Sequence, residues 1–185
     1  YGVVDERMNL ALVKEIAERN PEIHFVMIGP VVKIDPSDLP ALANIHWLGA
    51  KSYKELPNYI STWQAAIIPF LINDATRFIS PTKTPEYLSA GLPVISTPIT
   101  DVINPYGKNN LVSIASDAAS FSNCINNELN RADKEQWLES VDAFLNGNSW
   151  NATWKHMRTL INNSMANKRK TKKIIALNPL QQIRV

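Results

Sequence analysis

The residues best suited to chemistry lie between positions 73 and 97. One carboxylate, Glu86, stands about one turn into a predicted helix, and Thr82, Lys83 and Thr84 supply hydroxyls and a cation just before it. The start of a helix has unpaired N–H groups and the positive end of the helix dipole, which attract phosphate. A carboxylate one turn further on can accept hydrogen bonds from a ribose diol. This combination favours a nucleotide, whereas the alternative is that Glu86 caps its own helix.

Other common catalytic signals are absent from the sequence. It contains no Gly-x-Gly-x-x-Gly, no P-loop and no Gly-x-Ser-x-Gly motif. His24 and His46 lie within apolar segments, and His156 lies on a predicted helix, without the spacing of metal ligands. A single cysteine, Cys124, excludes an intramolecular disulfide and a multi-cysteine zinc site. The sequence therefore predicts no bound metal and no resident cofactor.

The elements that position the segment alternate in type along the chain. Short apolar segments predict buried strands at residues 23–29, 45–49, 65–70, 93–97 and 111–115. Helical patterns cover residues 5–19, 52–62, 84–90, 116–130, 134–145 and 149–167, with a turn or two at 36–43. This alternation predicts βαβ units, so the fold class is α/β, a Rossmann-like parallel sheet with helices on both faces.

A parallel sheet of this kind binds ligands at the carboxyl ends of its strands. The loops after Gly2, Gly29, Gly49, Phe70 and Thr97 are therefore the expected surroundings of the site.

Local signals place several helix ends. Asp5 is the predicted cap of the first helix, and Ser52 with Glu55 three residues later predicts a capping box. Gly91 follows the end of the helix that carries Glu86. In the last helix, apolar side chains recur at helical spacing over residues 150–165, for which we expect core packing.

Composition and charge limit the classes of protein to which the sequence can belong. The 185 residues are 45% hydrophobic and 19% charged, enough to bury a core, and the net charge is +2. Residues 168–185 carry six basic side chains and no acid, so the remainder has an excess of acid and offers no basic face for nucleic acid. For this basic tail we favour a solvated linker over a membrane contact. Without a membrane span or signal peptide, we expect a cytoplasmic protein, with peripheral association at the inner face of the membrane as an option.

The beginning of the sequence, YGVVDER, has the pattern of a strand end that turns into the first helix. We therefore expect a domain upstream of it.

The segment Ser80–Val94, SPTKTPEYLSAGLPV, resembles the donor-binding signature of GT-B-fold glycosyltransferases of the group 1 type. IHFVMIGP, NIHWLGAKSYKELPNYI and AAIIPF follow the order found in the C-terminal half of these enzymes, and YGVVDER is similar to the glycine turn that opens that half. The resemblance covers roughly residues 1–165. It implies the C-terminal, donor-binding half of a GT-B fold.

The resemblance also implies roles for individual residues. Glu86 matches the glutamate that binds the ribose hydroxyls of the nucleotide sugar, and Lys83 matches a lysine near the donor phosphates. The loop from Ser80 through Pro81 and Thr82 to Thr84 matches the one whose backbone faces the diphosphate and the sugar.

Further donor-binding positions lie outside this loop. Gly2 matches the glycine beside the diphosphate, and the loop from Gly49 to Lys51 matches the one beside the base. Arg77 is a further cation that can contribute to the donor site or form an ordinary surface salt bridge. The sequence also departs from the family pattern. Phe78 stands where many retaining members have a first glutamate, and of the two cations after the glycine turn only Arg7 is present.

The resemblance implies a function for the two parts of the chain. Residues 1–167 are expected to bind a nucleotide sugar of the UDP or GDP type without a metal, and residues 168–185 form the basic tail. An upstream domain would bind a glycan or lipid-linked acceptor and supply the catalytic base, so the part described here is not expected to catalyse transfer alone. Bacterial cell-envelope polysaccharide synthesis is the expected setting. The alternatives are a non-catalytic nucleotide- or partner-binding module of Rossmann-like fold and a GT-B-fold epimerase.

Overall fold

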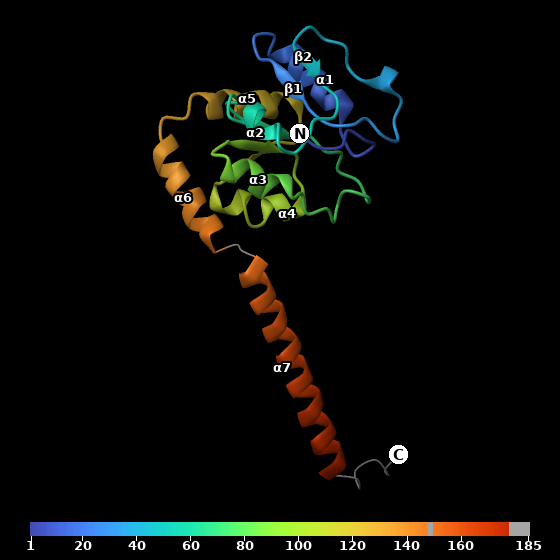
Figure 1. The fold of residues 1–185 in the computed structure, drawn as a ribbon, viewed down its shortest axis with the longest axis vertical. Helices are drawn as coiled ribbons and strands as arrows, with labels where there is room; N and C mark the ends of the chain where they lie inside the picture. The colour runs from blue at the N-terminus through green and yellow to red at the C-terminus, as the bar shows by residue number, and fades with distance from the viewer. Residues whose placement is uncertain (148–149, 178–185) are drawn as a thin grey trace. The chain divides into compact units, whose positions relative to one another are not determined.

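The computed structural model describes residues 1–147 and 150–177, and it describes side chains for residues 1–147 and 151–168. The chain divides into two compact units, Tyr1–Asp142 and Ala143–Val185. The first unit contains every strand of the described residues and the signature segment (Figure 1). Each unit is considered by itself below.

The five predicted strands are present, each shorter than its apolar segment. They are β1 (Phe25–Met27), β2 (Ile45–Trp47), β3 (Ala66–Ile68), β4 (Val94–Ser96) and β5 (Val112–Ile114). All the pairings between them are parallel, as predicted, in a β1–β2 sheet and a β3–β4–β5 sheet. Phe25 lies opposite Ile45, and Ile95 lies opposite Ile67 on one side and Ser113 on the other. The α/β class is therefore confirmed.

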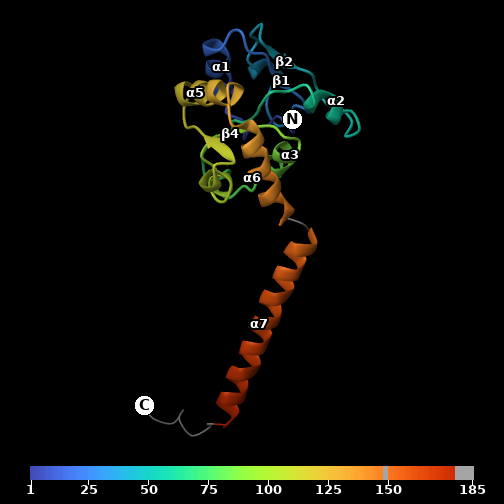
Figure 2. The same cartoon turned by 90° about the vertical axis from the view of Figure 1, so that its left-hand side faces the viewer.

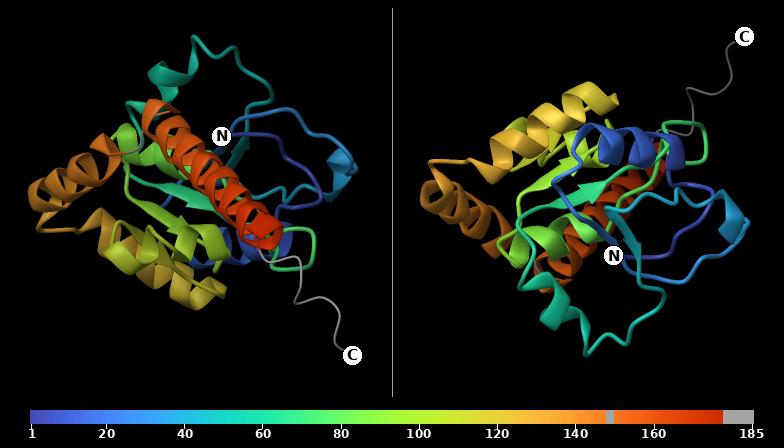
Figure 3. Two further views of the ribbon diagram at one scale, coloured as in Figure 1. Left: turned by 90° about the horizontal axis from the view of Figure 1, so that it is seen from below. Right: turned by 90° about the horizontal axis from the view of Figure 1, so that it is seen from above.

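Helices cover both faces of the strands in the first unit, again as predicted. The helices of this unit are α1 (Leu10–Arg19), α2 (Leu56–Ile60), α3 (Lys83–Ser89), α4 (Thr100–Ile103), α5 (Ala118–Leu129) and the part of α6 (Lys134–Asn146) up to Asp142. Turns of 3-10 helix form at Pro36–Asp38 and Gly107–Asn109. Seen from above in Figure 3, α1 and α5 lie on one side of the strands and α3 lies on the other. Figure 2 shows α1 and α5 side by side at the same end of the unit.

One hydrophobic core joins the two sheets. Val13 and Ile16 of α1 and Phe121 of α5 are completely buried, and they pack with residues of β1, β2 and β4. Burying a side chain of this size contributes about 1.5–3 kcal/mol. On the opposite face, Tyr87 and Leu88 are buried and fix α3 against the strands. The core therefore sets where the start of α3 lies relative to the strand ends.

Three local predictions were wrong in detail. The first helix begins at Leu10 with Asn9 as its cap, because the Asp5 carboxylate is paired with the Arg7 guanidinium instead. At Ser52 only one half of a capping box forms, in which the Glu55 carboxylate accepts from the Ser52 N–H at 2.9 Å. The predicted helix over residues 52–62 shortens to α2, and the four-residue helix α4 was not predicted.

The second unit contains α7 (Trp150–Leu177), which runs ten residues beyond the predicted helix end at 167. We expected core packing for its apolar stripe, and the second unit by itself does not supply that packing. The five stripe side chains whose positions are described are 50–59% exposed, namely Trp154, Met157, Leu160, Ile161 and Met165. Among the described residues, no helix combines the length and the apolarity that a membrane span requires.

Candidate functional site

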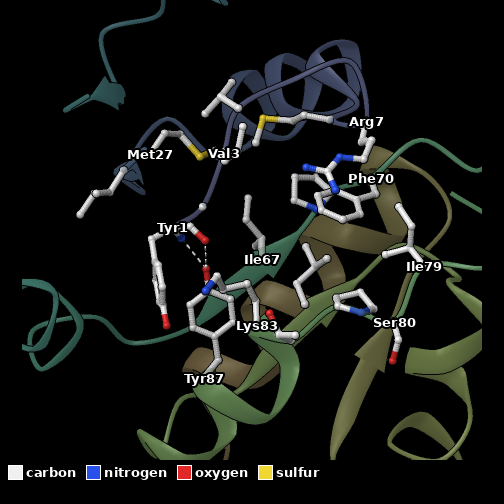
Figure 4. Close-up of a pocket in the computed structure, with 18 residues that line it drawn as sticks. Tyr1, Val3, Arg7, Met27, Ile67, Phe70, Ile79, Ser80, Lys83 and Tyr87 are labelled. Atoms are coloured by element: carbon white, nitrogen blue, oxygen red, sulfur yellow. Dashed lines mark hydrogen bonds between the residues drawn. The ribbon is translucent and has the colours of Figure 1, made fainter. Parts of the chain in front are cut away.

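A pocket of about 250 Å³ opens at the carboxyl ends of β1 and β3. Its wall comes from four parts of the chain: residues 1–8, the end of β1, the end of β3, and the loop that leads into α3 (Figure 4). This is the position at which a parallel α/β sheet binds its ligands. The sequence argument that placed the site at the strand ends is therefore consistent with the location of the pocket.

Three glycines pack backbone against backbone beside the pocket. The Gly2 N–H donates to the Ile28 carbonyl at 2.8 Å, and the Gly29 N–H donates to the Gly49 carbonyl at 2.9 Å. A Cβ on Gly29, whose φ is +151°, would lie 1.7 Å from the Gly2 carbonyl oxygen. Only glycine tolerates both this positive φ and the lack of space for a Cβ. The first loop can therefore lie directly on the end of β1, with the pocket open above it.

The start of α3 carries a small charged network. Lys83 Nζ donates to Glu86 Oε2 at 2.6 Å, and the Tyr1 hydroxyl donates to the same oxygen. Lys83 Nζ also lies 4.4 Å from the centroid of the Tyr1 ring. The Glu86 carboxylate is thus occupied by two side chains. The alternative in which Glu86 caps its own helix is not observed, because α3 has no side-chain cap.

Tyr1 and Tyr87 contact each other directly beside this network. The Tyr1 amino group donates to the Tyr87 hydroxyl, which in turn donates to the Tyr1 carbonyl at 3.2 Å, and the two rings meet edge to face with centroids 5.2 Å apart (Figure 4). Sequence reasoning missed both tyrosines. For Tyr87 the available signal was its position directly after Glu86, but the contact with Tyr1 spans 86 positions and left no local pattern.

Burial and charge alter the titration of these groups. Desolvation disfavours the charged form of Glu86, but hydrogen bonds from Lys83 and Tyr1 outweigh it, so the pKa of Glu86 is lowered. Burial raises the pKa of the Tyr1 hydroxyl well above its ordinary value. It also raises the pKa of the Tyr87 hydroxyl far above its ordinary value. Glu86 therefore stays an acceptor at neutral pH while the tyrosine hydroxyls stay donors.

Arg7 reaches the other side of the pocket. Its Nε donates to Asp5 Oδ1 at 2.8 Å, and its guanidinium carbon lies 5.8 Å from the centroid of the Phe70 ring. The hydrogen bonds from Arg7 lower the pKa of Asp5, whose side chain is almost fully buried. Arg7 is thus held in place by a buried carboxylate and lines the pocket. Sequence reasoning noted it only as the single cation after the glycine turn.

The structure gathers half of the predicted site residues around the pocket. Those that line it are Gly2, Ser80, Pro81, Thr82 and Lys83. Glu86 adjoins them through its hydrogen bond to Lys83.

The other predicted residues lie outside the pocket wall. Thr84 lies on the inner face of α3 and is completely buried. Gly49 touches the site only through its carbonyl bond to Gly29, and Lys51 is exposed beyond it. Arg77 is also exposed, with its guanidinium over the Phe78 ring at 5.5 Å. Among the side chains that the structure describes, no three His, Cys, Asp or Glu residues gather as metal ligands would.

Comparison with protein families gives one match. The sequence profile described as "Glycosyl transferases group 1" matches residues 7–131, which is more than half of the chain and includes the whole signature segment. One curated relative is a protein of Bacillus subtilis (strain 168), provisionally named as the teichuronic acid biosynthesis glycosyltransferase TuaH. It is 28% identical over 99 residues, which are 52% of this chain and 25% of the relative. The chain thus matches about a quarter of that relative's length.

Solved structures share the fold at low sequence identity. The N-terminal domain of Candida albicans trehalose-6-phosphate phosphatase superposes with a TM-score of 0.65 at 12% identity, covering 88% of this chain and 41% of that one. WaaG, a glycosyltransferase involved in lipopolysaccharide biosynthesis, superposes with a TM-score of 0.55 at 12% identity, covering 80% of this chain and 43% of WaaG. AviGT4, a glycosyltransferase involved in avilamycin A biosynthesis, superposes with a TM-score of 0.50 at 15% identity, covering 81% of this chain and 51% of AviGT4. These likenesses support the fold.

Proposed function

The chain belongs to the group 1 glycosyl transferases, and from this premise we propose that its first unit holds the nucleotide-sugar donor of a glycosyl transfer reaction. The observation that carries the proposal is the set of groups around one pocket at the strand ends. Gly2 and residues 80–83 line it, and Glu86 stands beside it with its carboxylate bonded to Lys83. Gly2 lets a ligand approach the backbone closely, Lys83 supplies a cation, and Glu86 supplies a hydrogen-bond acceptor that is paired with Lys83.

Glu86 is the proposed partner of the ribose. Its Oε2 accepts from the Tyr1 hydroxyl, an oxygen donor of the kind that a ribose diol also presents. The diol would take the place of the Tyr1 hydroxyl, so the carboxylate keeps its hydrogen bonds in both states. Because the Glu86 side chain is 40% exposed, a ligand can approach it without disturbing the core.

Lys83 is the proposed partner of the diphosphate. Its ammonium lines the pocket and lies between Glu86 and the Tyr1 ring. In the reaction, the acceptor oxygen forms a bond to the anomeric carbon while the bond from that carbon to the diphosphate breaks. The nucleoside diphosphate leaves with the electron pair, and a cation fixed at this place stabilises its developing charge. The proton of the acceptor passes to a base that we expect outside the residues of this chain.

The proposal includes a setting. A UDP- or GDP-type donor, used without a metal and transferred to a glycan or a lipid-linked acceptor in cell-envelope polysaccharide synthesis, agrees with the family and with the names of TuaH and WaaG. A cytoplasmic site with access to the inner face of the membrane is where such donors and acceptors meet.

The test is a heteronuclear NMR titration with UDP, GDP, ADP and dTDP. We expect one of them to shift resonances of residues 80–91. We expect Glu86→Gln to weaken its binding by about ten- to a hundredfold, since a hydrogen bond to a charged group is worth about 1.5–3 kcal/mol. Glu55→Gln is the matched control, because that carboxylate bonds Ser52 in an exposed turn away from the pocket. Equal binding by both variants, or no shift with any nucleotide at millimolar concentration, would refute the donor site.

A further inference from the structure

Two histidines that lie 22 positions apart in the sequence come into direct contact beside β1 and β2. His24 Nδ1 lies 2.9 Å from His46 Nε2, and the centroids of the two rings are 5.0 Å apart, with 36° between the ring planes. Sequence reasoning missed this contact, because it depends on the pairing of two strands and not on local spacing. Neither ring lines the pocket of the proposed donor site, so that proposal does not use them.

The pairing of the two strands places both imidazoles on one face of the sheet. Side chains alternate between the two faces along a strand. Phe25 and Ile45 lie opposite each other, and both are buried in the core. His24 and His46 each stand next to one of these residues, so they project from the opposite face. The Phe25 N–H donates to the Asn44 carbonyl at 2.8 Å, which fixes the two backbones beside the rings.

The two rings are accessible, and they bond to each other. Among the described residues, the hydrogen-bond partner of each imidazole is the other imidazole. One nitrogen of the contact donates and the other accepts, so the accepting nitrogen carries a free lone pair. His24 is exposed and His46 is half-buried, so a small ion can reach the contact from solvent. Imidazole nitrogens are the most common metal ligands in proteins.

The separation of the two nitrogens indicates the kind of ion that fits. A metal ion lies about 2.0–2.1 Å from an imidazole nitrogen. Two such nitrogens are about 2.9 Å apart when they subtend 90° at the ion, and about 3.3–3.4 Å apart at the tetrahedral angle. The observed distance of 2.9 Å equals the first value. Angles of about 90° belong to square-planar and tetragonal coordination, which Cu²⁺ and Ni²⁺ prefer.

We propose that His24 and His46 form a binding site for a Cu²⁺ or Ni²⁺ ion that links β1 to β2. His24 Nδ1 and His46 Nε2 are the two protein ligands. Water fills the other positions, because no third His, Cys, Asp or Glu side chain of the described residues gathers with them. A site with open positions holds an ion that exchanges, in contrast to a closed structural site with four protein ligands.

Binding replaces the hydrogen bond between the rings with two bonds to the ion. The donor nitrogen gives up its proton, which passes through water to the other nitrogen of the same ring, so that each ring binds the ion through a lone pair. The exposed ring of His24 turns to direct its lone pair at the ion instead of at His46. The backbone pairing of β1 with β2 stays in place, so the ion adds a side-chain link to it.

The first test is a titration of the untagged chain with Cu²⁺, followed by isothermal calorimetry and electron paramagnetic resonance. We expect the chain to bind Cu²⁺ about 100-fold more tightly than His24→Gln does, because the strands hold the second imidazole at a high effective concentration. The spectrum should show splitting by two nitrogen nuclei, and by one in the variant. His156→Gln is the matched control, because His156 lies on α7 in the second unit, and it should leave both results unchanged.

A second measurement tests the link between the strands. With free Ni²⁺ at 100 times its dissociation constant, the ratio of folded to unfolded chain at a fixed urea concentration should rise by about 50- to 100-fold. The lower value allows for weak binding of the ion by single histidines of the unfolded chain. At the same concentration of Ni²⁺, His24→Gln should show a rise of about twofold or less.

Three results would overturn the proposal. Equal affinity of the unchanged chain and of His24→Gln for Cu²⁺ would show that the ion binds elsewhere. A spectrum with a single nitrogen ligand in the unchanged chain would show that the two rings do not share an ion. An equal effect of Ni²⁺ on the unfolding of both would show that the ion does not link β1 to β2.

Discussion

The close contact of Gly2 with Gly29 makes a sharp prediction for Gly29→Ala. The new Cβ would lie 1.7 Å from the Gly2 carbonyl oxygen and 2.6 Å from its carbonyl carbon, so the backbone of Gly2 has to move by more than an ångström. An alanine held at a φ of +151° adds strain, at about 1–3 kcal/mol, to an overpacking cost of about 1–3 kcal/mol. We expect the free energy of unfolding to fall by about 3–5 kcal/mol.

Gly49→Ala is the matched control. Gly49 also has a positive φ, +66°, but a Cβ there meets nothing within 4 Å. The control therefore carries only the conformational cost, about 1–2 kcal/mol. Both variants are measured by urea unfolding followed by circular dichroism. Failure of Gly29→Ala to fold where Gly49→Ala folds agrees with the prediction, whereas a difference of less than 1 kcal/mol between the two would refute the steric reasoning.

Three further predictions concern buried polar groups of the first unit. Thr84 Oγ1 is buried with no hydrogen-bond partner among the described atoms. Thr84→Val should therefore leave the free energy of unfolding, measured by urea unfolding, unchanged or raise it by up to about 1 kcal/mol, and a loss above about 1 kcal/mol would contradict this. The Glu128 carboxylate, whose side chain is 4% exposed, accepts hydrogen bonds from the Arg131 guanidinium at 2.7 and 2.9 Å. Glu128→Gln should therefore lower the free energy of unfolding by about 2–4 kcal/mol in the same assay, and a loss near zero would count against the buried pair. The folded-state pKa of Asp5 is lowered by Arg7, so the unfolded chain binds more protons and the stability that Asp5 supplies is lost as the pH falls through and below its ordinary range near 4. Asp5→Asn should therefore make the midpoint less dependent on pH between about 5 and 2, and an unchanged pH profile would argue against this linkage.

The repeating elements of the fold could be predicted from the sequence because their signals are local. Each predicted strand contains an observed one, such as β3 within residues 65–70, and the helix that carries Glu86 begins one residue before its predicted start. Short elements escaped prediction because four residues, as in α4, carry no periodicity. Asp5 was assigned to a cap because its competing partner, Arg7, is a matter of side-chain geometry and not of spacing.

The site was predicted in part, for a similar reason. Lys83 and Glu86 belong to one contiguous motif and lie together in the structure. The contacts of Tyr1 with Glu86 and Tyr87 join positions 85 and 86 residues apart, and they exist only because the first loop folds back onto α3. Thr84 belongs to the same motif, but the helix turns its side chain into the core.

The division of the sheet has a consequence for cooperativity. No strand of β1–β2 pairs with a strand of β3–β4–β5 in the described residues, and the two parts are held together largely by the apolar core that α1 and α5 share. Hydrophobic stabilisation weakens on cooling, whereas backbone hydrogen bonds within each part do not depend on that term. Cold should therefore loosen the joint between the two parts before either sheet melts, so low temperature is the condition under which they are expected to behave as separate cooperative units.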